Sequence, residues 1–384
     1  MNNFIKYIND TISFNNTPKE FRKIVFYSEG KPYWSHFESI INCLLYNSGC
    51  NFCYVSSSQD DPGLSLESER VKTFLIGKGI ARTIFFRTLK AGILIMTMPD
   101  FETFHIKRSV HPVHYVYIFH SMVSTHMIYR AEAFDHYDTV FCVGPHHVDE
   151  IRKREHIYSL KKKNLFEHGY GRLDDIISSN IANVTNGKNN YFNVLIAPSW
   201  GKHSIIESGT ADKLISSLIH KNCKIILRPH PQTKINNIDS INLLNDKFSN
   251  FSNYTYDDDV NSQKALHTAD IMISDWSGVA LEFSFGLELP VLFLDLPEKT
   301  NNDTWKDLNI TPLESTIRNE VGEILPINEI QNAAVLIETI CLNSDKYIQA
   351  IRKTREKYIF NVGASGEIAA KELISLSNAN MLDE

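Results

Sequence analysis

A turn between two apolar runs carries the first residues suited to binding a phosphate. The segment ADIMISDWSGVALEFSFGLELPVLFLD covers residues 269–295, and Ser277 and Gly278 lie where a helix would follow a buried strand. A helix start offers free backbone N–H groups and the positive end of the helix dipole. Gly278 permits close approach of a ligand, the Ser277 hydroxyl adds a donor, and Glu282 follows one helical turn later, where it would accept from hydroxyls. The pattern predicts a diphosphate-binding turn, although a simple helix cap at Asp275 or Ser277 would give the same sequence.

A second polar group, Arg228 and His230 in LRPHP, follows the apolar run CKIIL. Ligands of open α/β sheets gather at the carboxyl ends of the strands, so this group and the turn after DIMIS meet if their strands are neighbours. Taken alone, each group is equally compatible with an ordinary loop. Together they predict a donor site made of Arg228, His230, Ser274, Asp275, Ser277, Gly278 and Glu282.

Short apolar runs that alternate with helix-like segments must position these residues. The expected strands lie at residues 23–30, 51–57, 92–99, 114–121, 139–144, 164–171, 192–199, 223–231, 251–256, 270–275 and 290–295. Amphipathic stretches such as HFESIINCLLYN, ADKLISSLIHK and GVALEFSFGL lie between them. Strands of this length alternating with helices predict parallel sheets.

A segment rich in Asn, Ser and Gly, SSNIANVTNGKNN, divides these strands into two groups. Its composition is typical of a linker, which we place at residues 178–190. We therefore expect an α/β fold of the GT-B type, with two doubly wound, Rossmann-like domains facing each other across a cleft. Residues 1–177 would form the acceptor-side domain and residues 191–384 the nucleotide-donor domain, with the last helix crossing back to the first domain.

Composition is that of an ordinary globular protein and argues against several functions. The chain has 384 residues, of which 43% are hydrophobic and 22% charged, and its net charge of −6 argues against nucleic-acid binding. No run approaches the roughly 18 apolar residues of a membrane span, and the start of the chain lacks a signal-peptide core, so we expect a cytosolic location. The six scattered cysteines are expected to be reduced and structural.

Several motifs together resemble the CDP-glycerol glycerophosphotransferase family, whose members include enzymes of wall teichoic acid synthesis. LRPHP and ADIMISDWSGVALEF resemble the family's Arg-Pro-His element and its ADxxIxDYSSxxxDF pattern. HGYGRLDDI (168–176) resembles its Gly-Tyr-Pro-Arg-Asn-Asp element, and LIAPSW (195–200) resembles the opening of its second domain. The resemblance covers roughly residues 110–375, and it implies interdomain or donor contacts for Gly169, Arg172, Asp174 and Ser199.

The chain departs from the family pattern at three of these positions. Gly278 replaces the second of two serines, Glu282 replaces an aspartate, and Gly171 replaces a proline. These changes leave the fold assignment in place and bear on which donor is used.

The resemblance also implies catalytic histidines. The family's WHGTP element corresponds to YVYIFHSMVSTH, which makes His120 the general base, with Ser121 and Met122 in place of the family's glycine and threonine. Phosphoryl transfer to a hydroxyl requires such a base, together with donors or cations that absorb phosphate charge, and His230 suits the second role. A zinc site is the competing interpretation, but the spacing fits no ligand set and no metal is expected for His105, His111, His114, His120 and His126.

The leading interpretation is a transferase that moves glycerol phosphate, or a related polyol phosphate, from a CDP-activated donor to a hydroxyl of a surface-polysaccharide or lipid-linked acceptor, with release of CMP. The nucleotide-activated donor is a substrate, and no cofactor is required. The inner face of the membrane is a further candidate partner, and the loop SEGKPYWSHFES (28–39) is a candidate for shaping the acceptor site, with His36. The alternatives are a GT-B nucleotide-sugar glycosyltransferase of capsule or lipopolysaccharide synthesis and a non-catalytic component of a glycan-assembly complex.

Overall fold

A seven-stranded parallel sheet forms the centre of the first domain. The computed structural model describes residues 2–182, 191–259 and 262–380, and this sheet has the order β3-β2-β1-β4-β5-β6-β7. Its strands are β1 (Ile24–Ser28), β2 (Phe52–Ser56), β3 (Val71–Leu75), β4 (Ile93–Met96), β5 (His114–Ile118), β6 (Thr139–Cys142) and β7 (Asn164–Glu167). The central strands are buried on both faces, which explains their continuous apolar runs.

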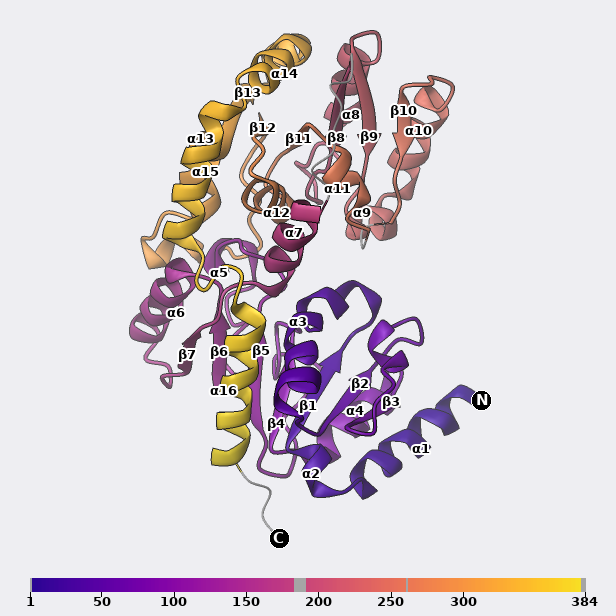
Figure 1. Ribbon diagram of the computed structural model, residues 1–384, viewed down its shortest axis with the longest axis vertical. Helices are drawn as coiled ribbons and strands as arrows, with labels where there is room; N and C mark the ends of the chain where they lie inside the picture. Colours follow the sequence, from indigo (N-terminus) through magenta and orange to yellow (C-terminus); the bar gives the residue numbers. More distant parts are fainter. Residues whose placement is uncertain (1, 183–190, 260–261, 381–384) are drawn as a thin grey trace.

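A six-stranded parallel sheet forms the centre of the second domain, in the order β10-β9-β8-β11-β12-β13. Its strands are β8 (Phe192–Ile196), β9 (Cys223–Leu227), β10 (Tyr254–Tyr256), β11 (Ile271–Ser274), β12 (Val291–Asp295) and β13 (Gly322–Pro326). The two sheets and the GT-B-type arrangement agree with the expected fold class, and Figure 1 shows the two domains stacked along the long axis.

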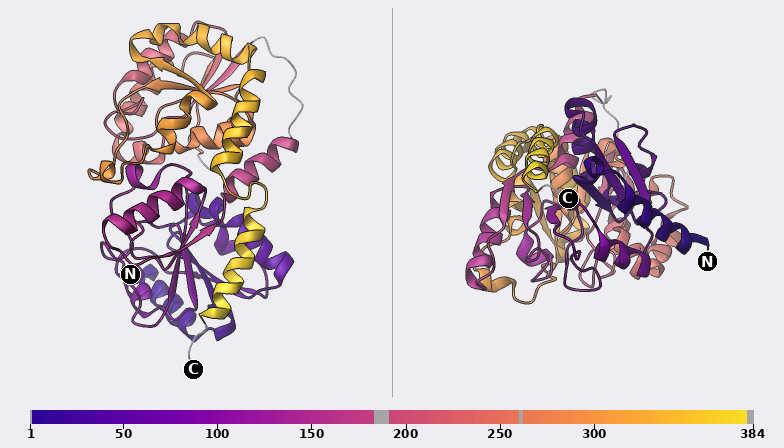
Figure 2. Two further views of the ribbon diagram at one scale, coloured as in Figure 1. Left: turned by 90° about the vertical axis from the view of Figure 1, so that its left-hand side faces the viewer. Right: turned by 90° about the horizontal axis from the view of Figure 1, so that it is seen from below.

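Helices cover both faces of the two sheets (Figures 1 and 2). In the first domain they are α1 (Asn2–Asn16), α2 (Lys19–Arg22), η1 (Lys31–His36), α3 (Glu38–Asn42), η2 (Cys43–Ser48), η3 (Pro62–Ser65), α4 (Ile80–Thr88), α5 (Thr125–Ile128), α6 (Pro145–Ile157) and α7 (Gly171–Ala182). The others are α8 (Thr210–Leu218), α9 (Pro231–Asn236), α10 (Ile238–Phe248), α11 (Lys264–Thr268), α12 (Gly278–Leu287), η4 (Trp305–Leu308), α13 (Leu313–Val321), η5 (Ile327–Asn332), α14 (Ala333–Leu342), α15 (Asp345–Tyr358) and α16 (Ser365–Ala379).

Two strands were absent from the sequence expectation, and both lie at sheet edges. β3 borders the first sheet and is partly exposed, and β13 borders the second sheet and begins at Gly322 directly after α13. An edge strand contacts one neighbour only, so its sequence can be less apolar than that of a central strand. The apolar-run criterion therefore missed both.

The segment expected as a linker was wrong over its first residues. Residues 178–182 continue helix α7, and the remaining residues, 183–190, lie outside the described part of the chain. Helix α7 packs against α12 of the second domain, so this stretch contributes to the contact between the domains. The segment resembled a linker because it is rich in polar residues, of which Ser178 is exposed and Ser179 partly exposed.

Helix α12 was expected to be amphipathic, but it is buried nearly all round. Its residues from Ala280 to Leu287 are buried, because the helix lies under β11 and β12 and also faces the first domain. A helix that is apolar on every side is characteristic of such a central position. This helix therefore connects the core of the second sheet with the first domain.

The end of the chain returns to the first domain (Figure 1). Helix α16 packs against α3, and its Ala369, Ala370 and Leu373 belong to the apolar cluster on one face of the first sheet. Among the described residues no helix combines the length and the apolar character that crossing a membrane would require.

Candidate active site

The carboxyl ends of both sheets supply the residues of the candidate site. The strand order reverses between β1 and β4 in the first sheet and between β8 and β11 in the second. Loops diverge at such a reversal and leave room for a ligand at the carboxyl ends of the strands. His120 follows β5, while Ser199, His230 and Ser277 follow β8, β9 and β11.

His120 is held in one tautomer by its surroundings. Its Nδ1 lies 3.2 Å from the Thr97 carbonyl oxygen, which only accepts, so Nδ1 carries the proton and Nε2 keeps a lone pair. The rings of Tyr33 and Tyr129 contact the imidazole edge-on, at centroid distances of 5.8 and 5.7 Å. Burial lowers the pKa of His120 to about 4, against the opposing effects of the Thr97 carbonyl and Glu282. A neutral imidazole with a free Nε2 lone pair can accept a proton at neutral pH.

A buried ion pair joins the two domains beside His120. Arg172 Nε donates to Glu282 Oε2 at 2.8 Å, and its Nη1 donates to Ser35 Oγ at 3.0 Å. The Tyr170 hydroxyl lies 2.8 Å from Glu282 Oε1 and 3.0 Å from the His120 carbonyl oxygen. Glu282 raises the pKa of Arg172, so the guanidinium stays charged. Arg172 and Glu282 were both expected at the site, and the structure places them against each other, so the carboxylate is already engaged.

The start of helix α12 meets the segment that follows His120. Ser277 precedes the helix with its backbone in the extended region, and no side-chain hydrogen bond caps the helix start. A Cβ added at Gly278 would lie 2.4 Å from Ser121 Oγ and 3.5 Å from Val123 Cγ1. The glycine therefore allows the first domain to approach the helix start. This close approach brings the predicted phosphate-binding turn and His120 to the same region.

Ser274 and Asp275 support a loop instead of facing a ligand. Ser274 Oγ donates to the Ala197 carbonyl oxygen at 2.7 Å, and the Asp275 carboxylate accepts from the Ser199 and Ile205 backbone N–H groups at 2.7 and 3.0 Å. Burial raises the pKa of Asp275, and these hydrogen bonds oppose the rise. Both side chains thus hold the loop after β8.

That loop carries Trp200 into a group with His230 and Lys299. Lys299 Nζ lies 4.4 Å from the centre of the Trp200 ring, whose centroid is 6.1 Å from that of His230. His230 Nδ1 accepts from the Gln232 backbone N–H at 3.1 Å, so Nε2 carries the proton of the neutral ring and can donate. Burial lowers the pKa of His230 to about 3, and the charges of Lys299 and His120 contribute to this shift.

Lys299 is a cation that the sequence analysis missed. Burial lowers its pKa to about 8, while Asp275 and Glu207 favour the charged form. It follows β12, so the rule that ligands gather at carboxyl ends of strands could have identified it. Lys299 was not recognised because it lies four residues beyond the strand, in a loop of polar residues.

Arg228 was expected to bind donor phosphate, but its side chain is occupied. Its Nε and Nη2 both donate to Asp257 Oδ2, at 2.8 and 2.6 Å, and Nη2 also donates to the Ser262 carbonyl oxygen at 3.0 Å. The side chain is 5% exposed. The structure therefore engages Arg228 with Asp257 and Ser262, which follow β10 in the chain.

Gly169 and Asp174 fasten the returning end of the chain. Gly169 has a φ of +96°, and a Cβ there would lie 2.4 Å from the Phe360 carbonyl oxygen. Asp174 accepts from the Gly363 and Ser365 backbone N–H groups at 2.6 and 2.9 Å, directly before helix α16. These two residues were expected to make interdomain or donor contacts, and the structure places them at the crossover of the C-terminal segment.

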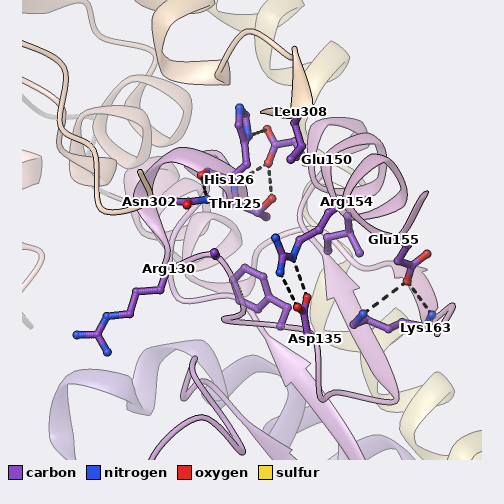
Figure 3. A pocket seen from close by; sticks show the side chains of 13 residues that line it. Thr125, His126, Arg130, Asp135, Glu150, Arg154, Glu155, Lys163, Asn302 and Leu308 are labelled. Carbon is purple, nitrogen blue, oxygen red and sulfur yellow. Dashed lines mark hydrogen bonds and ion pairs between the residues drawn. The ribbon is translucent and has the colours of Figure 1, made fainter. Parts of the chain in front are cut away.

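The histidine-rich region forms ordinary polar contacts. His126 Nδ1 lies 3.3 Å from Glu150 Oε1, and His114 Nε2 lies 2.8 Å from Thr139 Oγ1. No group of three His, Cys, Asp or Glu side chains within residues 2–182, 191–259 and 262–380 is arranged to hold a metal ion. A cavity of about 20 Å³, large enough for one water molecule, lies beside His126 and Glu150 (Figure 3). Its lining residues do not include His120, His230 or Lys299.

Comparison with known proteins identifies the family and the fold. A family model described as CDP-glycerol:poly(glycerophosphate) glycerophosphotransferase matches residues 13–308. A search of curated proteins found no match. Among solved structures, the wall teichoic acid polymerase TagF, in an H444N variant soaked with CDPG, has a TM-score of 0.59 at 14% identity, with 97% of this chain and 94% of that chain covered.

Other similar structures have different activities on the same fold. The UDP-GlcNAc 2-epimerase from Neisseria meningitidis has a TM-score of 0.58 at 12% identity, covering 92% of this chain and 99% of that one. A sucrose-phosphate synthase from Thermosynechococcus elongatus has a TM-score of 0.55 at 12% identity, with 93% and 99% covered. At these identities the likeness establishes the two-domain fold and leaves the chemistry to the family match and the site.

Proposed function

Because the chain belongs to the CDP-glycerol:poly(glycerophosphate) glycerophosphotransferase family, it is a transferase of glycerol phosphate from CDP-glycerol to a polymer acceptor, and we propose which residues carry out the transfer. In this proposal His120 is the general base. His230, Lys299 and the start of α12 bind the donor diphosphate. The observation that carries this proposal is the contact between His120 Nδ1 and the Thr97 carbonyl oxygen. This contact, at 3.2 Å, leaves the Nε2 lone pair for an acceptor hydroxyl.

The proposed step is a direct displacement at phosphorus. The acceptor oxygen forms a bond to the phosphorus that carries glycerol, its proton passes to His120 Nε2, and the bond to the bridging oxygen of the diphosphate breaks, so CMP leaves with that oxygen. Negative charge grows on the leaving phosphate during this displacement. A lysine ammonium, an imidazole N–H and backbone N–H groups stabilise such charge when they are already oriented toward it.

Donor binding would also tune the base. In the free protein burial holds the pKa of His120 at about 4, which makes the imidazole a weak base. An anionic diphosphate nearby favours the imidazolium form and raises this pKa toward the range where a general base is most effective near neutral pH. The base therefore becomes competent mainly when the donor is present. NMR titration of His120 with and without CDP-glycerol measures this effect, and an unchanged pKa on donor binding contradicts it.

The catalytic assignment is tested by separating turnover from donor binding. In His120→Ala, single-turnover transfer from CDP-glycerol should fall by about 10²–10⁴-fold, the usual contribution of a general base. Donor affinity, measured by calorimetry, should change far less. In His230→Ala, the donor affinity itself should fall. If His120→Ala keeps nearly full rate, another residue is the base.

The donor specificity is tested by ligand-dependent stability. CDP-glycerol should raise the melting temperature in a concentration-dependent way, whereas UDP-sugars and CMP-sugars should not, since a ligand that binds only the folded state stabilises it according to its affinity. Stabilisation by a UDP-sugar alone would favour a glycosyltransferase, and no stabilisation by any nucleotide would favour a non-catalytic role. We propose a hydroxyl-terminated polymer, attached to a lipid at the membrane surface, as the acceptor.

A further inference from the structure

A partly exposed ion pair lies at the reversal point of the first sheet. Glu29 directly follows β1, and Arg82 lies in the first turn of α4. Arg82 Nη1 is 3.5 Å from Glu29 Oε1, with side-chain exposures of 24% and 27%. Ligands of doubly wound sheets bind outside the strands that flank such a reversal, here β1 and β4.

Tyr33 connects this pair with the proposed base. Its ring lies edge-on to His120 at a centroid distance of 5.8 Å. Burial raises the pKa of Tyr33 to about 12, with a contribution from the charge of Glu29, so the phenol stays protonated next to the carboxylate. Tyr33 belongs to η1, in the loop that the sequence marked as a candidate for shaping the acceptor site. Tyr33 therefore contacts the proposed base and lies within the electrostatic influence of Glu29.

Arg82 retains capacity to bind another group. Its two recorded hydrogen-bond acceptors, Glu29 Oε1 and Tyr27 Oη, both lie at 3.5 Å, the outer limit of a hydrogen bond. Its Nε is buried and has no hydrogen-bond partner within the part of the chain that the structure describes. By contrast, the first-domain residue Arg154 holds Asp135 through two bonds of 2.9 and 2.6 Å. A guanidinium has five donors in a planar fork that suits phosphate, so Arg82 is under-used by the protein itself.

We propose that Glu29, Arg82 and Tyr33 form the acceptor subsite, in which Arg82 binds a glycerol phosphodiester of the acceptor and Glu29 accepts from its hydroxyl. This inference rests on the proposed function, because it needs a growing chain of glycerol phosphate as acceptor. The subsite lies on the first domain beside His120, and the donor group of His230 and Lys299 lies on the second. An acceptor held here would present its terminal hydroxyl to His120 Nε2.

The opposite charges of Glu29 and Arg82 suit a glycerol-phosphate chain. A glycerol-phosphate chain carries one negative charge and one or two hydroxyls per unit, so a cation and a carboxylate side by side match a phosphodiester and a neighbouring hydroxyl. The subsite would discriminate against a neutral polyol, because burying Glu29 and Arg82 beneath a ligand without charge leaves the guanidinium poorly solvated. This chemistry is shared by a free polymer and by one attached to a lipid.

The test measures acceptor binding and transfer separately. The probe is a synthetic trimer of glycerol phosphate, used in solution and, attached to a lipid, in phosphatidylcholine vesicles. In Arg82→Gln we expect the KM for the soluble trimer to rise at least tenfold while the affinity for CDP-glycerol stays within twofold. Glu29→Gln should also raise this KM, and Arg82→Lys should restore part of the loss. Arg87→Gln, on the exposed last turn of the same helix, is the matched control and should behave as the unsubstituted protein.

Direct binding keeps this inference distinct from the proposed function. If the unsubstituted protein transfers nothing to the trimer, the proposed transfer fails, and the subsite is then judged by trimer binding to His120→Ala, measured by NMR. Binding that weakens at least tenfold on adding Arg82→Gln supports the subsite. Equal binding in both, or no binding at all, overturns it. An effect seen only with the lipid-linked trimer assigns the subsite to the lipid-attached acceptor, and an effect with both assigns it to the polymer itself.

Discussion

Replacing Glu282 with glutamine removes the negative charge that balances Arg172 between the two domains. The two side chains are 9% and 10% exposed, and the Nε–Oε2 distance is 2.8 Å. The glutamine amide would place N–H groups or a neutral oxygen opposite the guanidinium, whose other recorded bond is to Ser35 Oγ at 3.0 Å. Breaking a buried ion pair by removing one partner typically costs about 3–5 kcal/mol, because an unpaired charge stays in a poorly solvated site.

We therefore expect Glu282→Gln and Arg172→Gln each to lower the free energy of unfolding by about 3 kcal/mol or more. The double variant should be destabilised by clearly less than the sum, since the two amides can bond to each other. Urea unfolding followed by tryptophan fluorescence measures this, because Trp34 lies in the first domain and Trp200, Trp276 and Trp305 lie in the second. If the transitions of the domains separate, each is fitted on its own.

A matched surface pair provides the control. Arg352 and Glu288 form a contact of 2.6 Å, shorter than the buried one, but Arg352 is 55% exposed. Exposed pairs are screened by solvent, so Arg352→Gln should leave the unfolding curve nearly unchanged. Additive effects of Glu282→Gln and Arg172→Gln, each below about 1 kcal/mol, would show that the interdomain pair behaves like a surface pair and would refute the reasoning.

Three further outcomes follow from the same contacts. Lys299→Met should weaken CDP-glycerol binding, measured by calorimetry, about tenfold or more. Binding to the unsubstituted protein should weaken above pH 8, because the Lys299 ammonium, with its pKa of about 8, loses its proton there. Lys299→Arg should remove this pH dependence. Burial lowers the pKa of His168 to about 3, so below pH 6.5 the unfolded chain binds a proton at this histidine that the folded chain does not bind, and the stability present above pH 6.5 is lost as the pH falls. In urea titrations between pH 6.5 and 4, His168→Leu should abolish about 3 kcal/mol of this loss. An unchanged pH slope would contradict the prediction. Gly278→Val should cost about 1–3 kcal/mol through collision with Ser121, and Ser121→Gly should recover part of it; failure of this rescue would mean that the domains do not approach as described.

The central strands and the helix start at Gly278 could be predicted because they depend on local sequence. Central strands of a parallel sheet are buried on both faces, so continuous apolar runs predict them, as for β1, β4 and β11. The edge strands β3 and β13 lack this requirement and were missed. The helix start at Gly278 was recognisable because its residue types follow directly from the geometry of the turn.

The partners of the polar side chains could not be predicted. Arg228 and Lys299 are both cations placed after strands of the second sheet, yet one is held by Asp257 and the other lies over Trp200 beside His230. Glu282 was expected to meet a ligand and instead meets Arg172, 110 positions away. No spacing in the sequence distinguishes these outcomes.

The sequence by itself determined the two sheets, the family and the order in which polar residues follow the strands, because strand burial and helix starts impose residue types on short, contiguous segments. Only the tertiary structure decided which of those residues form hydrogen bonds or ion pairs within the protein and which do not. Hydrogen bonds and ion pairs depend on distances of about 3 Å between atoms from separate loops, and the packing of the two domains sets those distances.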